Sequence, residues 1–271
     1  MAATRLLSAE QAVAELVPEN GTVGVGGMHM TAAPMALVRE LVRRRVRIGR
    51  LVTSPSTSLQ ADLPIGAGLV DELVSPYVGF EDLGLAPSFR RAAEEGSLRV
   101  LECDEGGLTH ALYAGSGGIP FVPLPAGIER TDIPAASPEL YADTKDPFTG
   151  ETRWAIRALR PDVALIACRE ADEEGNVAFG RIAFTDRLLA LAARRLVVQV
   201  ERLVPAAEIA AHASGTTLPA FLVSAVVVAP GGCRPTSFPG EYERDEAELR
   251  AYLAAARTPE GFEEYLGATA G

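Results

Sequence analysis

Cysteine, histidine and lysine are all scarce in this chain of 271 residues. The three cysteines, Cys103, Cys168 and Cys233, lie far apart in apolar surroundings, and the three histidines lack the spacing of metal ligands. This pattern excludes a disulfide framework and gives no sign of a metal centre, so we expect no bound metal. We also expect reduced, buried thiols, as in a cytoplasmic protein.

Basic charge and long hydrophobic runs are lacking too. The chain has 25 Lys and Arg against 36 Asp and Glu, which gives a formal net charge of −11, and Lys145 is its one lysine. Nucleic-acid binding needs a basic field, so we expect no nucleic-acid partner. The longest apolar run, 218–230, is too short to span a bilayer, and Glu10 and Glu15 follow Arg5 too soon for a signal peptide. These features predict a cytoplasmic protein without a membrane segment.

A glycine-rich stretch near the N-terminus is the most informative feature of the sequence. A short run with β-branched residues begins at Thr22, contains Gly24 and leads into the pair Gly26-Gly27. Pro34 then opens an amphipathic helix pattern. Bare backbone at the carboxyl end of a strand allows a ligand to approach closely. In open α/β sheets, ligands bind at that edge.

The same stretch does not match the common nucleotide motifs. Gly24 and Gly26 fit the first two positions of a dinucleotide fingerprint, but His29 occupies the third, and the next strand ends in Thr53 and Ser54 without an acid for a ribose. A phosphate loop fails as well, because no Gly-Lys-Ser/Thr follows. Two interpretations stay open: a ligand-binding loop, or a tight turn whose glycines serve packing alone.

Short apolar runs alternate with helix patterns along most of the chain. We expect strands at 22–26, 46–53, 71–75, 98–102, 163–168, 196–200 and 223–229. We expect helices at 34–45, 87–95, 108–114 and 185–194 and two more at 245–266, and a first helix that the capping-box pattern of Ser8 and Gln11 opens and Pro18 ends. This alternation predicts an α/β fold with an open, mostly parallel, doubly wound sheet flanked by helices. We expect a single domain over residues 1–271, with an irregular, flap-like or partner-facing excursion at about 126–160.

Few polar residues stand out as candidates for chemistry. Glu105 follows a predicted strand, where a carboxylate can serve as a nucleophile or general base, but an acid at a helix start is also favoured by the helix dipole. His29 either contacts a ligand beside the glycines or lies on the surface. A cluster of arginines is typical of a solvated face and could instead meet an anionic ligand: Arg39, Arg43, Arg44, Arg45, Arg47 and Arg50.

Six segments, taken in order, resemble the class I CoA-transferases. Residues 23–34 are similar to the glycine loop of these enzymes, 75–80 to their S-Y-x-G segment and 118–121 to their G-x-P-F run. Residues 161–176 are similar to their P-D-V-A…A-D-x-x-G-N signature, 198–204 to their V-E strand and 230–245 to the G-A-x-P-T tail of the glutaconate CoA-transferase α-subunit branch. Met28 replaces the family phenylalanine in the glycine loop. The resemblance covers nearly the whole chain and implies the fold of the NagB/RpiA/CoA-transferase type.

The resemblance also implies an activity and a partner. Such α subunits work with a homologous β subunit, often as α2β2, and a β-subunit glutamate attacks the acyl-CoA to form a glutamyl-CoA thioester. The expected substrates are an acyl-CoA and a carboxylic acid, and the coenzyme A thioester is a substrate rather than a tightly bound cofactor. By this resemblance, backbone N–H groups of Gly26, Gly27 and Met28, with Gly24 and His29 alongside, form the oxyanion or acyl-CoA-binding loop.

A neighbouring branch of the family leaves a second activity open. The α subunit of the IpdA-like steroid ring-opening hydrolases carries its working carboxylate in an Asp-Glu-Gly segment, which Asp104-Glu105-Gly106 resembles. In that case Glu105 is the general base for water, or the nucleophile, in cleavage of a C–C bond in a cyclic ketone CoA thioester.

Overall fold

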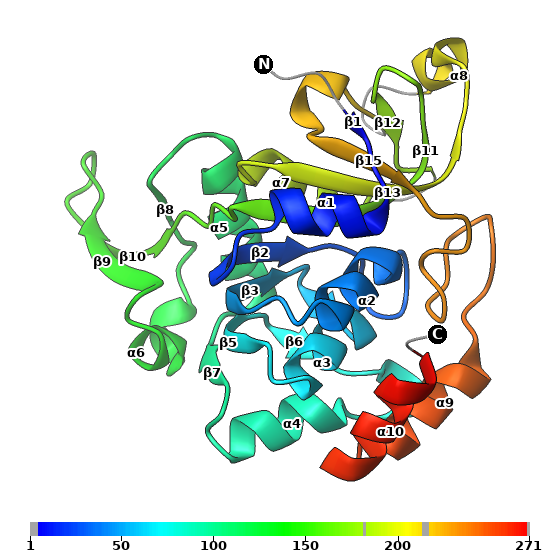
Figure 1. Ribbon diagram of the computed structural model, residues 1–271. Helices are drawn as coiled ribbons and strands as arrows, with labels where there is room; N and C mark the ends of the chain where they lie inside the picture. Colours follow the sequence, from blue (N-terminus) through cyan, green and yellow to red (C-terminus); the bar gives the residue numbers. More distant parts are fainter. Residues whose placement is uncertain (1–4, 181–182, 213–216, 270–271) are drawn as a thin grey trace.

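A mostly parallel sheet forms the centre of the computed structural model, which describes residues 5–180, 183–212 and 217–269 (Figure 1). The strand order is β1-β15-β13-β11-β2-β3-β5-β7, and each neighbouring pair in this order is parallel. The bounds are β1 Arg5–Leu6, β2 Gly21–Val25, β3 Ile48–Thr53, β5 Val70–Val74, β7 Arg99–Leu101, β11 Val163–Ala171, β13 Leu196–Leu203 and β15 Ala225–Val228. The short β12 (Val177–Ala178) pairs antiparallel with β11 and with β14 (Thr217–Leu218). The predicted open, doubly wound sheet is confirmed.

Helices pack on both faces of the sheet and create two hydrophobic cores. One core joins inward-facing residues of β2 and β3 to α1 (Ala9–Leu16), α2 (Met35–Arg43), α3 (Leu59–Gly66), α9 (Glu246–Ala255) and α10 (Pro259–Thr269). The other lies under α5 (Glu105–Ser116) and α7 (Asp186–Ala192). Alternate residues of β11 show why two cores form: Val163 and Leu165 belong to the first, and Ala164 and Ile166 to the second.

Local sequence signals explain where several helices begin. The Ser8 side chain accepts from the Gln11 N–H, and the Gln11 side chain accepts from the Ser8 N–H, so a capping box opens α1. α4 (Pro87–Glu94) starts with proline in its first turn. α3 was not predicted, because residues 59–66 are buried almost throughout and carry a proline, so they show no amphipathic pattern.

The predicted irregular excursion at 126–160 is wrong in part. This segment contains η2 (Ile128–Arg130), the short α6 (Ile133–Ala136) and the strands β9 (Tyr141–Lys145) and β10 (Thr152–Arg157). β10 pairs antiparallel with both β9 and β8 (Phe121–Pro123), and the three strands stand beside the main sheet (Figure 1). β9 is mostly exposed, and the buried residues of β10, Ala155 and Ile156, are adjacent, so neither strand shows the apolar alternation that marks a half-buried strand.

The topology also places the candidate residues of the sequence at one edge. The strands β2, β3, β5 and β7 are parallel, so the loops after them emerge on the same side of the sheet. Among the described residues, no helix is both long and apolar enough to cross a membrane.

Candidate active site

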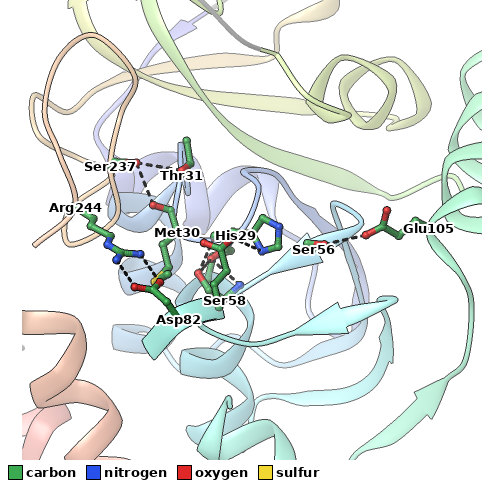
Figure 2. Close-up of polar contacts among 11 residues, drawn as sticks. His29, Met30, Thr31, Ser56, Ser58, Asp82, Glu105, Ser237 and Arg244 are labelled. Carbon is green, nitrogen blue, oxygen red and sulfur yellow. Dashed lines mark hydrogen bonds and ion pairs between the residues drawn. The ribbon is translucent and has the colours of Figure 1, made fainter. Parts of the chain in front are cut away.

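Two loops and one helix start meet at the carboxyl edge of the sheet. We call residues 26–34, after β2, the glycine loop, and residues 54–58, after β3, the serine loop. The His29 N–H donates to the Ser56 carbonyl oxygen at 2.8 Å, and the Ser56 hydroxyl donates to Glu105 Oε1 at 3.1 Å (Figure 2). The structure thus brings His29 and Glu105 to opposite sides of one buried serine.

Glu105 is the first residue of α5, and its neighbour Asp104 takes over the capping role. The Asp104 side chain accepts from the Gly107 N–H at 2.9 Å, as an N-cap residue does. Glu105 is exposed and points toward Ser56 (Figure 2). The two interpretations of this acidic pair therefore separate: Asp104 caps the helix, and the Glu105 carboxylate faces the glycine-loop edge.

The backbone N–H groups of the glycine loop are already engaged inside the chain. Gly26 donates to the Leu165 carbonyl oxygen, Met28 to the Thr31 carbonyl oxygen, and Gly27 to the Asp186 carboxylate. The expectation that Gly26, Gly27 and Met28 offer free N–H donors is therefore not met in this structure. Their contribution to acyl-CoA binding stays a prediction, and the partly exposed residues at the tip of the loop, Met28 and His29, are the ones that can touch a ligand.

Close packing accounts for the glycines of the loop. A Cβ at Gly26 would lie 2.7–2.8 Å from the Asp186 carboxyl atoms, so only glycine allows that carboxylate to approach. Gly27 has a φ of +85°, a conformation that other residues rarely adopt. Gly24, within β2, lies against Leu189 of α7. The packing interpretation of the glycine-rich stretch explains all three positions.

Asp186 is a fully buried carboxylate beneath the two loops. Its Oδ1 accepts from the Gly27 N–H at 3.0 Å and from the Ser54 hydroxyl at 2.9 Å, and its Oδ2 accepts from the same N–H at 2.9 Å. Burial raises the pKa of Asp186 from its ordinary 3.8 to about 6, although both hydrogen bonds act in the opposite direction. At neutral pH the carboxylate is ionised and gathers donors from both loops.

His29 is held in an unusual backbone conformation at the tip of the glycine loop. Its φ is +50°, and its carbonyl oxygen accepts from the Ser58 hydroxyl at 2.7 Å and from the Gln60 side chain at 3.2 Å. The imidazole packs edge-on against Tyr77, with ring centroids 5.9 Å apart, and its Nδ1 lies 3.6 Å from Glu81 Oε1. A strained residue fixed on several sides is a common property of functional loops.

The other two histidines and most of the arginine cluster have partners within the chain. His110 Nδ1 lies 2.7 Å from the Gly106 carbonyl oxygen, and His212 Nε2 lies 2.6 Å from Glu170. Most of the arginine cluster forms ion pairs within the chain, which supports the solvated-face interpretation: Arg39 with Glu248, Arg43 with Glu40, Arg44 with Glu10, Arg47 with Asp71 and Arg50 with Glu72.

The cysteines are free and buried, as predicted. Burial raises the pKa of Cys103 to about 12 and also raises the pKa values of Cys168 and Cys233, so all three stay protonated at neutral pH. Within the described part of the chain, no group of three or more His, Cys, Asp or Glu side chains is placed to hold a metal ion.

Three residues of this site were not identified from the sequence: Ser54, Ser56 and Asp186. The Ser/Thr cluster after β3 was a signal for the first two, because polar side chains at the end of a buried strand face the same edge as the glycine loop. Asp186 gave no signal of its own. It lies 159 residues from Gly27 and looks like an ordinary acid at a helix start.

Comparison with known proteins gives a consistent set of relatives. A family model described as Coenzyme A transferase matches residues 6–229. A 3-oxoadipate CoA-transferase subunit of Pseudomonas knackmussii is 34% identical over 97% of this chain and 94% of its own length. The cholesterol ring-cleaving hydrolase IpdA subunit of Rhodococcus jostii is 32% identical over 96% and 90%. An uncharacterized protein of Archaeoglobus fulgidus is 33% identical over 97% of this chain, which spans 59% of that longer protein.

Solved structures agree with the fold. A variant of the decarboxylase AibA/AibB is 33% identical, with a TM-score of 0.86 over 98% of this chain and 100% of the other. Glutaconate coenzyme A-transferase from Acidaminococcus fermentans superposes with a TM-score of 0.89 over 98% and 88%, at 24% identity, and so shares the fold. The relatives with 32–34% identity are thus named for three different reactions: a transfer, a ring cleavage and a decarboxylation.

Proposed function

This chain belongs to the coenzyme A transferase family, as its motifs predicted, and we propose that it is the α subunit of a heteromeric enzyme that moves coenzyme A between an acyl-CoA and a carboxylic acid. The observation that carries this proposal is the end-to-end likeness to the 3-oxoadipate CoA-transferase subunit, with 34% identity over 94% of that relative. The glycine loop, the serine loop and Glu105 together form the face that this chain contributes to the site.

A second, homologous subunit completes the proposed enzyme. Several relatives are named as one subunit of a larger enzyme, which supports a β partner, and we expect an α2β2 assembly in the cytoplasm. In this proposal a glutamate of the partner attacks the thioester carbonyl carbon, and the glycine-loop tip of this chain borders the acyl group. The coenzyme A thioester is a substrate, and no tightly bound cofactor takes part.

The chain's own residues give this edge its shape. The hydrogen bonds of Gly26, Gly27 and His29 hold the glycine loop rigidly, so its tip is preorganised rather than ordered by the substrate. Met28 presents a flexible apolar side chain beside the polar His29, which suits an acyl group that carries a polar end.

The proposal can be tested with the reconstituted complex. The chain is co-expressed with its β partner, the complex is incubated with an acyl-CoA, and the partner is trapped with borohydride. Borohydride reduces a glutamyl-CoA thioester to a primary alcohol and releases coenzyme A. A partner glutamate that carries coenzyme A by mass before the treatment, and is found as the alcohol after it, supports the transferase. Turnover of the thioester without any adduct, in a complex that binds it, would count against the transferase.

A ring-opening hydrolase is the second candidate, and one contact favours it. Glu105 is exposed, lies at the same edge as the glycine loop and accepts a hydrogen bond from the buried Ser56. A carboxylate so placed can act as general base: it takes a proton from water while the hydroxide adds to a ring carbonyl carbon. The adjacent C–C bond then breaks with its electron pair on the leaving carbon, which takes the proton back from the carboxyl group, and the carbonyl carbon becomes a carboxylic acid. The likeness to the cholesterol ring-cleaving hydrolase supports this alternative.

Glu105 itself discriminates between the two reactions. In the hydrolase, Glu105→Gln should lower kcat of the complex about 100-fold or more, because a general base contributes roughly 10²–10⁴-fold. In the transferase the nucleophile belongs to the partner, so the same variant should change turnover by less than about tenfold. Wild-type turnover by Glu105→Ala rules out the hydrolase.

A further inference from the structure

The glycine loop and the serine loop are joined at two levels. At the upper level, the His29 N–H donates to the Ser56 carbonyl oxygen at 2.8 Å. Beneath it, the Asp186 carboxylate accepts from the Gly27 N–H and from the Ser54 hydroxyl at 2.9–3.0 Å. In each loop a single residue separates the two contacts: Gly27 from His29 in one, and Ser54 from Ser56 in the other. A displacement of Gly27 or Ser54 therefore moves the upper contact as well.

The lower level is a built feature of this fold. Asp186, Ser54 and Gly27 are all buried, and Asp186 and Ser54 are 2% and 0% exposed. The missing Cβ of Gly26 is what allows the carboxylate to reach the loop, because a Cβ there would lie within 2.8 Å of all three carboxyl atoms. Among the described residues, the other titratable groups that face Asp186 are the protonated thiols of Cys168 and Cys233.

A buried carboxylate of this kind is not an ordinary stabilising element. A buried ionised group is costly unless it is paired, and here backbone N–H and hydroxyl dipoles replace a counter-charge. Such groups are retained mainly where the geometry they enforce is needed.

We propose that Asp186 is a positioning residue for the reaction at this site: it clamps the glycine loop to the serine loop and, through Ser56, sets where the Glu105 carboxylate lies relative to His29. The inference rests on the proposed function, in either of its two forms, and adds a residue that touches no substrate. Asparagine cannot replace the carboxylate fully. An amide oxygen at the Oδ1 position can still accept from both the Ser54 hydroxyl and the Gly27 N–H, but the NH2 group at the Oδ2 position then sets a donor against the Gly27 N–H, which lies 2.9 Å from Oδ2.

Two measurements on the complex of this chain with its partner test the clamp. In Asp186→Asn, amide hydrogen exchange in a peptide that covers residues 26–31 should accelerate at least about tenfold, because Gly27 loses a charge-assisted acceptor. The kcat should fall about 10- to 100-fold with a smaller change in KM, since misplacement of the reacting groups by about an ångström costs that much. Ser54→Ala, which removes one of the donors, should show both effects in weaker form and covers the case in which Asp186→Asn does not fold.

Two comparisons separate positioning from general damage. Asp162→Asn is the matched control. Asp162 accepts at 2.9 Å from the N–H of Thr22, near the start of β2, whereas the glycine loop follows the other end of that strand. This variant should leave kcat unchanged. The losses of kcat caused by Ser56→Ala and by Asp186→Asn should not add. In a chain that already carries Ser56→Ala, Asp186→Asn should lower kcat by less than about a further threefold.

The outcomes are distinct. Wild-type exchange in 26–31 together with a wild-type kcat in Asp186→Asn overturns the clamp, and so does a fully additive loss of kcat with Ser56→Ala. If the wild-type complex neither transfers coenzyme A nor cleaves a thioester substrate, the proposed function fails. The exchange measurement then still decides whether Asp186 holds the loops together.

Discussion

Replacing Asp186 by asparagine should change how the stability of the chain depends on pH. Burial raises the pKa of this carboxyl from 3.8 to about 6 in the folded chain, whereas in the unfolded chain it returns to its ordinary value. The folded state therefore binds a proton more tightly than the unfolded state does. The resulting contribution to stability is fully present below the unfolded pKa and is lost as the pH rises through the folded pKa.

The magnitude follows from the size of the shift. A shift from 3.8 to about 6, at about 1.4 kcal/mol per pKa unit, is a loss of about 3 kcal/mol once Asp186 is ionised. Asparagine cannot ionise, so the variant does not suffer this loss. The free energy of unfolding of Asp186→Asn minus that of the wild type should rise by about 2 kcal/mol between roughly pH 4 and pH 6 and change little above about pH 7.

Urea unfolding of the full-length chain measures this difference. The chain has one tryptophan, Trp154, whose fluorescence can be followed together with far-UV circular dichroism to test for two-state behaviour. Measurements near pH 4, 6 and 7.5 stay away from the sequence pI of about 4.9. Asp62, whose pKa burial also raises to about 6, is present in both proteins, so its contribution cancels in the difference.

The result that refutes this reasoning is simple to recognise. A difference that stays flat across this pH range means that Asp186 titrates alike in the folded and unfolded chains. A difference that falls with rising pH means that the folded chain lowers its pKa, so that the hydrogen bonds from Gly27 and Ser54 outweigh desolvation. Asp162→Asn is again the control, because Asp162 has a partly exposed side chain.

Three further predictions follow from named contacts. Gly26→Ala should destabilise the chain by about 1–3 kcal/mol, because its Cβ would overlap the buried Asp186 carboxylate, and urea unfolding checks this; unchanged stability contradicts the packing role of the glycine. Tyr252→Phe should cost about 1–3 kcal/mol and raise the pKa of Asp62 further, because the phenol donates to Asp62 Oδ2 at 2.7 Å; a variant as stable as the wild type at every pH refutes this. Ser56→Ala should lower kcat of the complex more than it raises KM, since Glu105 loses its hydrogen-bond donor; steady-state kinetics that show only a KM effect would assign Ser56 to substrate binding instead.

Much of the fold could be predicted because it rests on local patterns. The first halves of β11 and β13 are buried on both faces of a parallel sheet, so they form continuous apolar runs, 163–168 and 196–198, that are easy to recognise. The capping box that opens α1 is also a local pattern, since it needs only Ser8 and Gln11, three residues apart. The hairpin of β9 and β10 could not be predicted in this way, because β9 is mostly exposed and the buried residues of β10, Ala155 and Ile156, are adjacent rather than alternating.

The part of the site that could be predicted from the sequence is the part that directly follows recognisable strands. The glycine loop and Glu105 each follow a recognisable strand, and parallel topology then places them at one edge. The contact of Ser56 with Glu105 joins residues 49 positions apart, and the contact of Gly27 with the buried Asp186 joins residues 159 positions apart. No local sequence pattern can predict contacts between residues so far apart. The internal partners of the loop's N–H groups could not be predicted, because a bare glycine backbone looks the same whether a ligand or the protein itself supplies the acceptor.

Isotope tracing in the reconstituted complex tests the central claim most directly. The complex is incubated in H2(18)O with acetyl-CoA or succinyl-CoA as donor and with glutaconate or 3-oxoadipate as acceptor, and the products are followed by mass spectrometry. Transfer between two carboxylates exchanges a thioester without water, so the account predicts a new acyl-CoA and no 18O in the acid released in the first turnovers. Incorporation of 18O into the released acid with no new acyl-CoA would show thioester hydrolysis in place of transfer and contradict the account.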